Sequence, residues 1–199
     1  MTGRWTTLLA YLPFFFALTL LSTDALNGQS DSTYLLTINK IVERAQQDIS
    51  TGNLEALDLR LDSLYTIAQR TEHQDRKLLI LEALTELSIT SRKLIEATKY
   101  SEMALAIVRS NRSNLPDTLV DQAYFLHAEI HIENGEWNSF ETYIDSSYQI
   151  LDNLEKEDPV RQARNAIRMS FLSYNQGNLS KTIEWTQYCL LYTSPSPRD

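Results

Sequence analysis

The chain has 199 residues, with 18 basic and 26 acidic side chains and a formal net charge of −8. This acidic balance disfavours contact with phosphate backbones, so we expect no nucleic-acid binding. The single cysteine, Cys189, excludes an internal disulfide framework, so packing alone must stabilise the fold.

The N-terminal segment, residues 1–28, has the composition of a secretory signal peptide. Arg4 precedes an apolar run at residues 8–21, and small or polar residues follow up to Ala25, after which cleavage fits best. The run is shorter than the roughly 20 residues of a membrane-spanning helix. We therefore expect an exported protein, on the periplasmic or extracellular side. An uncleaved signal anchor is the alternative, and membrane tethering through this end or through a missing C-terminal part stays open.

The C-terminal segment, residues 189–199, resembles a translated sequencing adapter over its whole length (CLLYTSPSPRD). On this interpretation it is a non-native tail, and a C-terminal part of the protein is missing. An ordinary tail rich in serine and proline is the alternative. Residues 29–188 then form one domain, which is long enough to bury a core and keeps the net charge of −8.

A repeat of about 40 residues runs through this domain. Gly52, Gly135 and Gly177 lie in polar turns between helix-like stretches, and Arg92 stands where a further glycine is due, giving steps of 40, 43 and 42. Glycine ends helices in the left-handed conformation, so these positions indicate helix ends. Seven residues before each turn residue the sequence has a small side chain, at Ala45, Thr85, Ala128 and Ser170. Two residues after each turn residue it has an apolar side chain, at Leu54, Leu94, Trp137 and Leu179. Small residues let paired helices approach, and the apolar residue is expected to pack the second helix onto the first.

The apolar residues between the turns follow helical spacing, and no run alternates over enough residues to predict a strand. We therefore predict an all-α fold, a superhelical array of antiparallel helix pairs with about four repeats, the last incomplete. The helices are expected at residues 33–50, 54–70, 75–91, 94–110, 117–133, 137–153, 160–175 and from 179 onward.

This pattern resembles the tetratricopeptide-repeat (TPR) family over about residues 33–188. The segments that carry the resemblance are 133–137 (ENGEW), 175–179 (NQGNL) and 96–105 (EATKYSEMAL). The repeat is longer than the roughly 34 residues of the common form, so it is similar to the lengthened variant.

The resemblance includes one match and several departures. The family's two small positions in the second helix match Ala97 and Ala104, whereas the corresponding positions in two other repeats are Phe140 with Ser147 and Leu57 with Leu64. Exported repeats of this lengthened kind resemble the N-terminal regions of bacterial regulators that continue into a histidine kinase or a DNA-binding domain. The resemblance thus implies a protein-interaction or sensory domain. A free secreted or periplasmic TPR scaffold is the alternative.

The resemblance also indicates where a ligand would bind. In this family, first-helix residues line a groove that takes peptides. The columns ten and six residues before the turn residue supply the candidate ligand-binding residues Glu82, Glu86, Phe125, Glu129 and Phe171. Family members that clamp a terminal carboxylate use lysine and asparagine there, and glutamates would repel it. The expected partner is therefore a protein or peptide with basic and apolar side chains. The alternative is that these are packing or solvated positions.

Motifs for catalysis are missing from the sequence. It has no glycine-rich phosphate loop, nucleophile elbow or Cys–His pair, so we expect no enzymatic activity and no cofactor in this segment. His127 and His131 lie one helical turn apart, which could chelate a metal ion, but no third ligand is evident. A metal-dependent hydrolase is therefore the least favoured alternative, and no metal site is predicted.

Overall fold

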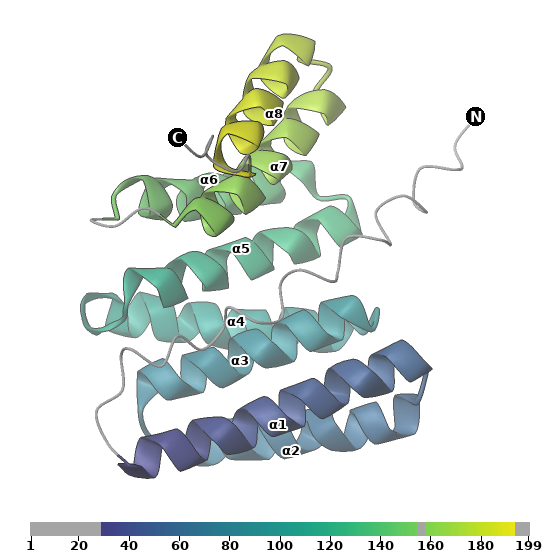
Figure 1. Ribbon diagram of the computed structural model, residues 1–199, viewed down its shortest axis with the longest axis vertical. Helices are drawn as coiled ribbons and strands as arrows, with labels where there is room; N and C mark the ends of the chain where they lie inside the picture. The colour runs from purple at the N-terminus through teal and green to yellow at the C-terminus, as the bar shows by residue number, and fades with distance from the viewer. Residues whose placement is uncertain (1–28, 155–157, 194–199) are drawn as a thin grey trace, which may run out of the picture. The chain divides into compact units, whose positions relative to one another are not determined.

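The computed structural model describes the backbone of residues 29–154 and 158–193, and side chains within residues 34–154 and 158–190. Within these residues the fold is all-α, without a strand (Figure 1). The prediction of an all-α helical-repeat array is thereby confirmed. The predicted signal peptide, 1–28, and the end of the predicted tail, 194–199, lie outside the described residues. None of the described helices is long and apolar enough to span a membrane.

Eight α-helices and a short 3-10 helix follow one another along the described chain. They are α1 (Gln29–Thr51), α2 (Leu54–Arg70), α3 (Gln74–Thr90), α4 (Leu94–Asn111), η4 (Arg112–Asn114), α5 (Asp117–Asn134), α6 (Trp137–Asp152), α7 (Pro159–Asn175) and α8 (Leu179–Thr193). The predicted bounds agree within one residue, except at the start of α1. The fourth pair has both helices, and α8 extends into the segment predicted as a tail. The tail's Leu-Leu-Tyr run is compatible with a helix, and its first proline comes only at Pro195.

The chain divides within α2 into two compact units, the first ending at Leu64 and the second beginning at Tyr65. In the first unit, α1 and α2 bury apolar side chains that include Ala45, Leu57 and Leu64. In the second unit α3 packs on α4, α5 on α6 and α7 on α8, and α3 also contacts α5. The first helices α3 and α5 therefore lie next to one another.

The same turn joins the two helices of every pair. Gly52, Arg92, Gly135 and Gly177 all have left-handed backbones, with φ of 71°, 63°, 74° and 74°. The N–H of each following residue donates to the carbonyl five residues back, as in Lys93 to Ser88 at 2.8 Å and Glu136 to His131 at 2.8 Å. This bond is part of the Schellman motif, which satisfies carbonyls at a helix end. The prediction that Arg92 occupies a glycine-type turn position is confirmed.

The columns on either side of the turn behave differently. Ala45, Thr85 and Ala128 are fully buried, as expected for small residues between paired helices. The apolar column after the turn packs less well than predicted, because Leu54 and Leu179 are 56% and 62% exposed. The buried position of the second helix lies three residues further along the chain, about one helical turn on, at Leu57, Ala97 and Phe140.

The central core of the second unit joins three helices. Phe140 and Ile144 of α6 are fully buried against α5 and α7, and Trp137 packs at the edge of the same cluster. Phe140 occupies one of the positions at which the TPR resemblance expects a small residue. The larger ring fills the space between α5 and α6, so its truncation to alanine should cost about 3–5 kcal/mol.

Candidate binding surface on the first helices

The predicted ligand-binding residues lie on the first helices of three successive pairs. Glu82 and Glu86 belong to α3, Phe125 and Glu129 to α5, and Phe171 to α7. Because α3 contacts α5 and several side chains join α5 to α7, these residues occupy one shared region. We call it the first-helix face and define it by the five residues together with Asp121, Gln122, Arg161, Arg164 and Arg168.

Glu82 lies inside this face rather than on its surface. Its side chain is fully buried, and neither carboxylate oxygen has a hydrogen-bond partner among the described residues. Burial raises the pKa of Glu82 well above its ordinary value, although the charges of Arg161 and Arg164 act in the opposite direction. Transfer of a carboxylate from water to the protein interior is costly when it gains no hydrogen-bond partner there, so burial favours the protonated form. Glu82 is therefore not a surface contact for a ligand.

Phe125 is also buried, and a neighbouring repeat covers it. The guanidinium carbon of Arg164 lies 3.6 Å from the centroid of the Phe125 ring, the geometry of a cation–π contact. The column ten residues before the turn is thus used for packing between repeats. For Glu82 and Phe125, the placement matches the alternative of packing positions.

The column six residues before the turn is more accessible. Three successive repeats contribute one residue each to this column, namely Glu86, Glu129 and Phe171, and all three are half-buried. Burial raises the pKa of Glu86 to about 7, and the charge of Arg164 lowers it. Glu129 forms an ion pair with Arg168, while its Oε1 atom is buried and has no hydrogen-bond partner among the described residues. The Phe171 ring lies 5.7 Å from the ring of Trp137.

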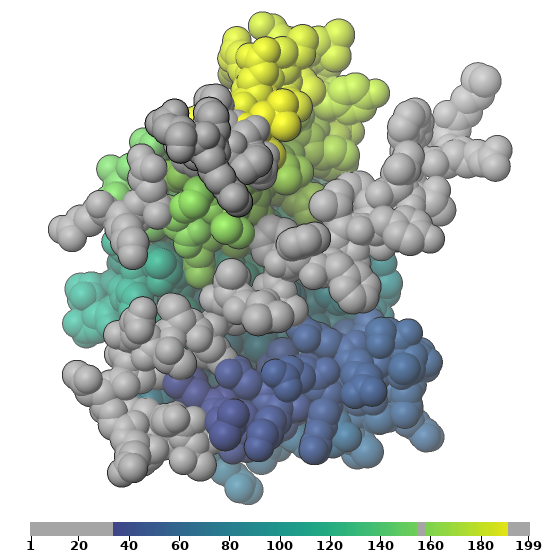
Figure 2. All heavy atoms as spheres, in the orientation of Figure 1, coloured from purple at the N-terminus to yellow at the C-terminus, as the bar shows by residue number. Residues whose placement is uncertain are grey.

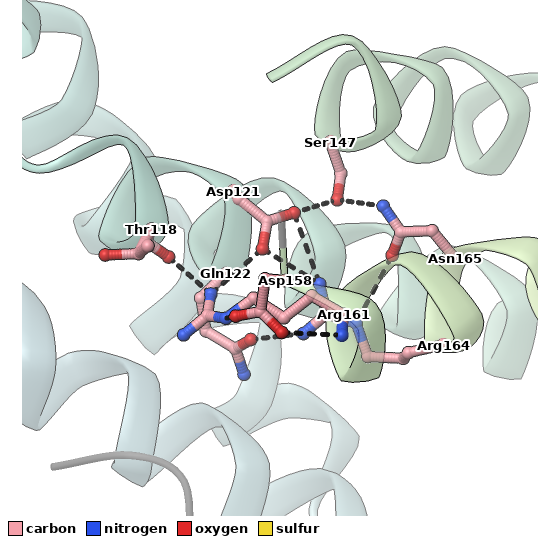
Figure 3. Close-up of polar contacts among 8 residues, drawn as sticks. All are labelled: Thr118, Asp121, Gln122, Ser147, Asp158, Arg161, Arg164 and Asn165. Atoms are coloured by element: carbon pink, nitrogen blue, oxygen red, sulfur yellow. Dashed lines mark hydrogen bonds and ion pairs between the residues drawn. The ribbon is translucent and has the colours of Figure 1, made fainter. Parts of the chain in front are cut away.

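A buried polar network joins α5 to α7 within the first-helix face (Figure 3). Asp121 is fully buried and accepts hydrogen bonds from Arg161 at 2.9 Å and from Arg164 at 3.0 and 3.2 Å. Arg164 also donates to Gln122, and Ser147 of α6 donates to Asp121. Two guanidinium groups therefore neutralise one carboxylate and satisfy its oxygens, which is the condition under which buried charges are tolerated.

The N-terminus of α7 is fixed to the same network. Asp158 caps the helix by accepting from the backbone N–H of Arg161 at 3.1 Å, and its carboxylate lies 3.1 Å from the Arg161 Nε atom. Arg161 also donates to the backbone carbonyl of Thr118 at 2.6 Å. One side chain thus connects the cap of α7 to the first turn of α5.

This network was not predicted from the sequence, and the negative charge of the face was overestimated. The prediction rests on the glutamates alone, whereas Arg161, Arg164 and Arg168 lie opposite them. The three arginines are spaced three and four residues apart, which puts them on one side of a helix. That spacing was a usable signal. Their partners could not be predicted from the sequence, because Asp121 lies 40 residues before Arg161 and 43 residues before Arg164.

The two histidines form an aromatic cluster beside the face. Their ring centroids are 4.8 Å apart, and Tyr143 contacts both rings, at 4.4 Å from His127 and 5.3 Å from His131. The Nδ1 atom of His127 lies 2.9 Å from the Ser101 hydroxyl, and that of His131 lies 2.6 Å from Glu136. No group of three or more metal-ligating side chains occurs among the described residues.

Burial lowers the pKa of His127 from 6.5 to about 4, and the charges of His131 and Arg109 act in the same direction. A neutral imidazole here both packs against Tyr143 and hydrogen-bonds to Ser101. The cluster therefore has the properties of a packing contact between α4, α5 and α6.

Comparison with protein-family models gives no match to this chain, and no curated protein matches it significantly.

Proposed function

We propose that this chain is an exported helical-repeat domain that binds a protein or peptide on its first-helix face. The observation that carries the proposal is the half-buried column formed by Glu86, Glu129 and Phe171 on three neighbouring first helices. Repeat arrays use such extended surfaces for binding, because each repeat adds one side chain per column to a continuous strip.

The chemistry of the column favours a ligand with basic and apolar side chains. Glu86 supplies a half-buried carboxylate as an acceptor for an ammonium or guanidinium group, whereas the Oε1 atom of Glu129 is buried. Phe171, with Trp137 beside it, supplies aromatic surface. Because Arg168 already neutralises part of the charge of Glu129, charge contributes to approach and orientation, and ring burial supplies most of the affinity.

The proposed setting is the sensory part of a longer bacterial regulator, with a free periplasmic or secreted TPR scaffold as the second candidate. The signal-peptide composition of residues 1–28 supports export, and the TPR resemblance supports both settings. A continuous gene sequence from source DNA, read beyond the codon for residue 188, distinguishes them. A kinase or DNA-binding domain supports the first setting, and a stop codon supports the second.

The binding proposal is tested with short fluorescent peptides and anisotropy titration of the full chain. One peptide alternates lysine and leucine, a second alternates glutamate and leucine, and a third is built of serine and glycine. We expect binding of the first peptide alone, weakening as salt is added. Glu86→Gln should reduce its affinity, whereas Glu102→Gln, on the exposed side of α4, should not. Equal binding of the lysine and glutamate peptides would contradict the proposal.

A further inference from the structure

Two glutamates of α3 lack a bonded partner within the first-helix face. Glu86 is half-buried, and no hydrogen bond or ion pair joins its carboxylate to another described side chain. One helical turn earlier, Glu82 is fully buried, and both of its carboxylate oxygens are without partners among the described residues. Side chains at positions i and i+4 of a helix are neighbours, so two negative charges there destabilise each other. We call Glu82 and Glu86 the glutamate pair.

The guanidinium groups whose charges act on the glutamate pair are bonded elsewhere. Arg161 and Arg164 of α7 both donate to Asp121 (Figure 3), and Arg168 forms an ion pair with Glu129. The helix that carries them also packs on α6, and Figure 2 shows the green side chains of α6 beside the yellow-green ones of α7. Turning an arginine toward the glutamate pair would break its present bonds. A neutralising group must therefore come from outside this set of side chains.

The two helices packed against α3 do not supply that group. On α4, the buried side chains include no charged residue. On α5, the charged groups facing the pair are the carboxylates of Asp121 and Glu129, and the charge of Asp121 raises the pKa of Glu82 further. The described neighbours of the pair are thus three arginines that already have partners, together with two more carboxylates.

In the absence of a ligand, a proton from water is the available neutralising group. Burial raises the pKa of Glu82 well above its ordinary value and that of Glu86 to about 7, although the charge of Arg164 lowers both. Glu82 holds its proton in the interior, where a ligand does not reach it. Glu86 is open both to a proton and to a cationic side chain of a ligand, and one carboxylate cannot ion-pair with the ligand while it keeps its proton.

We propose that Glu86 exchanges its proton for the cationic group of the ligand, so that the first-helix face binds basic ligands with release of a proton. This inference rests on the proposed function and adds its regulation by pH. In the exchange the O–H bond of the Glu86 carboxyl breaks, the proton passes to water, and the ligand's ammonium group pairs with the carboxylate. Binding is therefore favoured at high pH and is weakened as the pH falls and Glu86 becomes protonated.

The first test is the affinity of the full chain for the lysine–leucine peptide at about pH 6 and about pH 8, with circular dichroism to verify folding. The lysines stay charged over this range. We expect the dissociation constant to be about tenfold higher at the lower pH. Glu86→Gln should bind weakly and equally at both pH values. Glu102→Gln, on the exposed side of α4, is the matched control and should keep the tenfold ratio. Glu82→Gln should keep that ratio as well, whatever its absolute affinity.

Calorimetry of the same binding reaction counts the protons. In two buffers of different ionisation enthalpy at the lower pH, we expect the wild type to release about one proton per peptide and Glu86→Gln to release none. A titration without ligand uses carbon-13 NMR of the Glu86 carboxyl, identified by the resonance that is lost in Glu86→Gln. Its midpoint should lie near pH 7.

The outcomes separate the exchange from the binding proposal. Peptide binding that is equal at both pH values and releases no proton overturns the exchange and leaves the proposed function standing. A pH dependence that survives Glu86→Gln but disappears in Glu82→Gln or His131→Gln assigns the proton to another group and also overturns the exchange. A Glu86 midpoint below about pH 5, the range of an ordinary glutamate, overturns it without a ligand. Failure of the peptide to bind at either pH contradicts the proposed function and the exchange together.

Discussion

Asp121 of α5 accepts two hydrogen bonds from Arg164 of α7, at 3.0 and 3.2 Å, and both side chains are buried. This pair joins two successive repeats in the buried part of the first-helix face. It also fixes the position of the guanidinium that covers Phe125 and acts on the pKa of Glu86. The stability of the array and the properties of the proposed binding column therefore depend on the same side chains.

Removing one member of this pair should be far more costly than removing both. Asp121→Ala leaves two buried or half-buried guanidinium groups without their carboxylate, so we expect a loss of about 3–5 kcal/mol in the free energy of unfolding. Asp121→Ala combined with Arg164→Met should lose clearly less, because the remaining buried charge is replaced by apolar volume. Urea denaturation of the two variants provides the comparison. A double variant no more stable than Asp121→Ala would show that an unpaired Arg164 charge is not what destabilises the single variant.

Arg92 should be a site where glycine stabilises the protein. Its φ of 63° is unfavourable for a residue with a Cβ atom, and its ion pair with Glu133 is largely exposed and contributes little. We expect Arg92→Gly to raise the free energy of unfolding by about 1 kcal/mol. Gly135→Ala is the matched control. No atom lies within 4 Å of an added Cβ, so only the backbone conformation penalises it, again by about 1 kcal/mol. Thermal or urea unfolding that shows no gain for Arg92→Gly contradicts this prediction.

His127 should make the fold sensitive to acid. Because its folded-state pKa is about 4 and its ordinary value is 6.5, the unfolded chain binds the extra proton first as the pH falls. Stability should therefore decrease between about pH 6.5 and pH 4, by up to about 3 kcal/mol from this group. Comparing the pH slopes of wild type and His127→Gln isolates the contribution. The slopes are compared rather than the absolute values, because the variant also loses the contact with Ser101. Identical slopes would contradict the lowered pKa.

Glu86 should have the opposite pH dependence. Its pKa is raised from 4.5 to about 7 in the folded state, so folding is penalised once the pH passes 4.5 and the penalty is complete above about 7. Since the side chain is partly exposed, we expect Glu86→Gln to gain only on the order of 1 kcal/mol at about pH 8. The same variant should gain nothing at about pH 4, where the wild-type side chain is already protonated. A gain that is independent of pH would indicate a packing effect instead.

The helices and their turns were predictable from the sequence, whereas the accessibility of individual site residues was not. Left-handed turns recur at a fixed spacing, so the alignment located Arg92 at a turn although it is not a glycine. Burial depends on which side chain of the next repeat covers a position. Glu82 and Glu86 are both glutamates and one helical turn apart, yet Glu82 is fully buried and Glu86 is half-buried. Leu179 and Trp137 share a column, but Phe171 lies against the Trp137 ring whereas Leu179 is largely exposed.

The central claim, that ligands bind to the first-helix face, is tested most directly by hydrogen–deuterium exchange of the full chain with and without the lysine–leucine peptide. We predict slower exchange in α3, α5 and α7, strongest around Glu86 and Glu129, with little change in α4 and α6. Glu86→Gln should reduce that protection, and Glu102→Gln should leave it intact. Protection confined to α4 and α6, or no protection at saturating peptide, would contradict the claim.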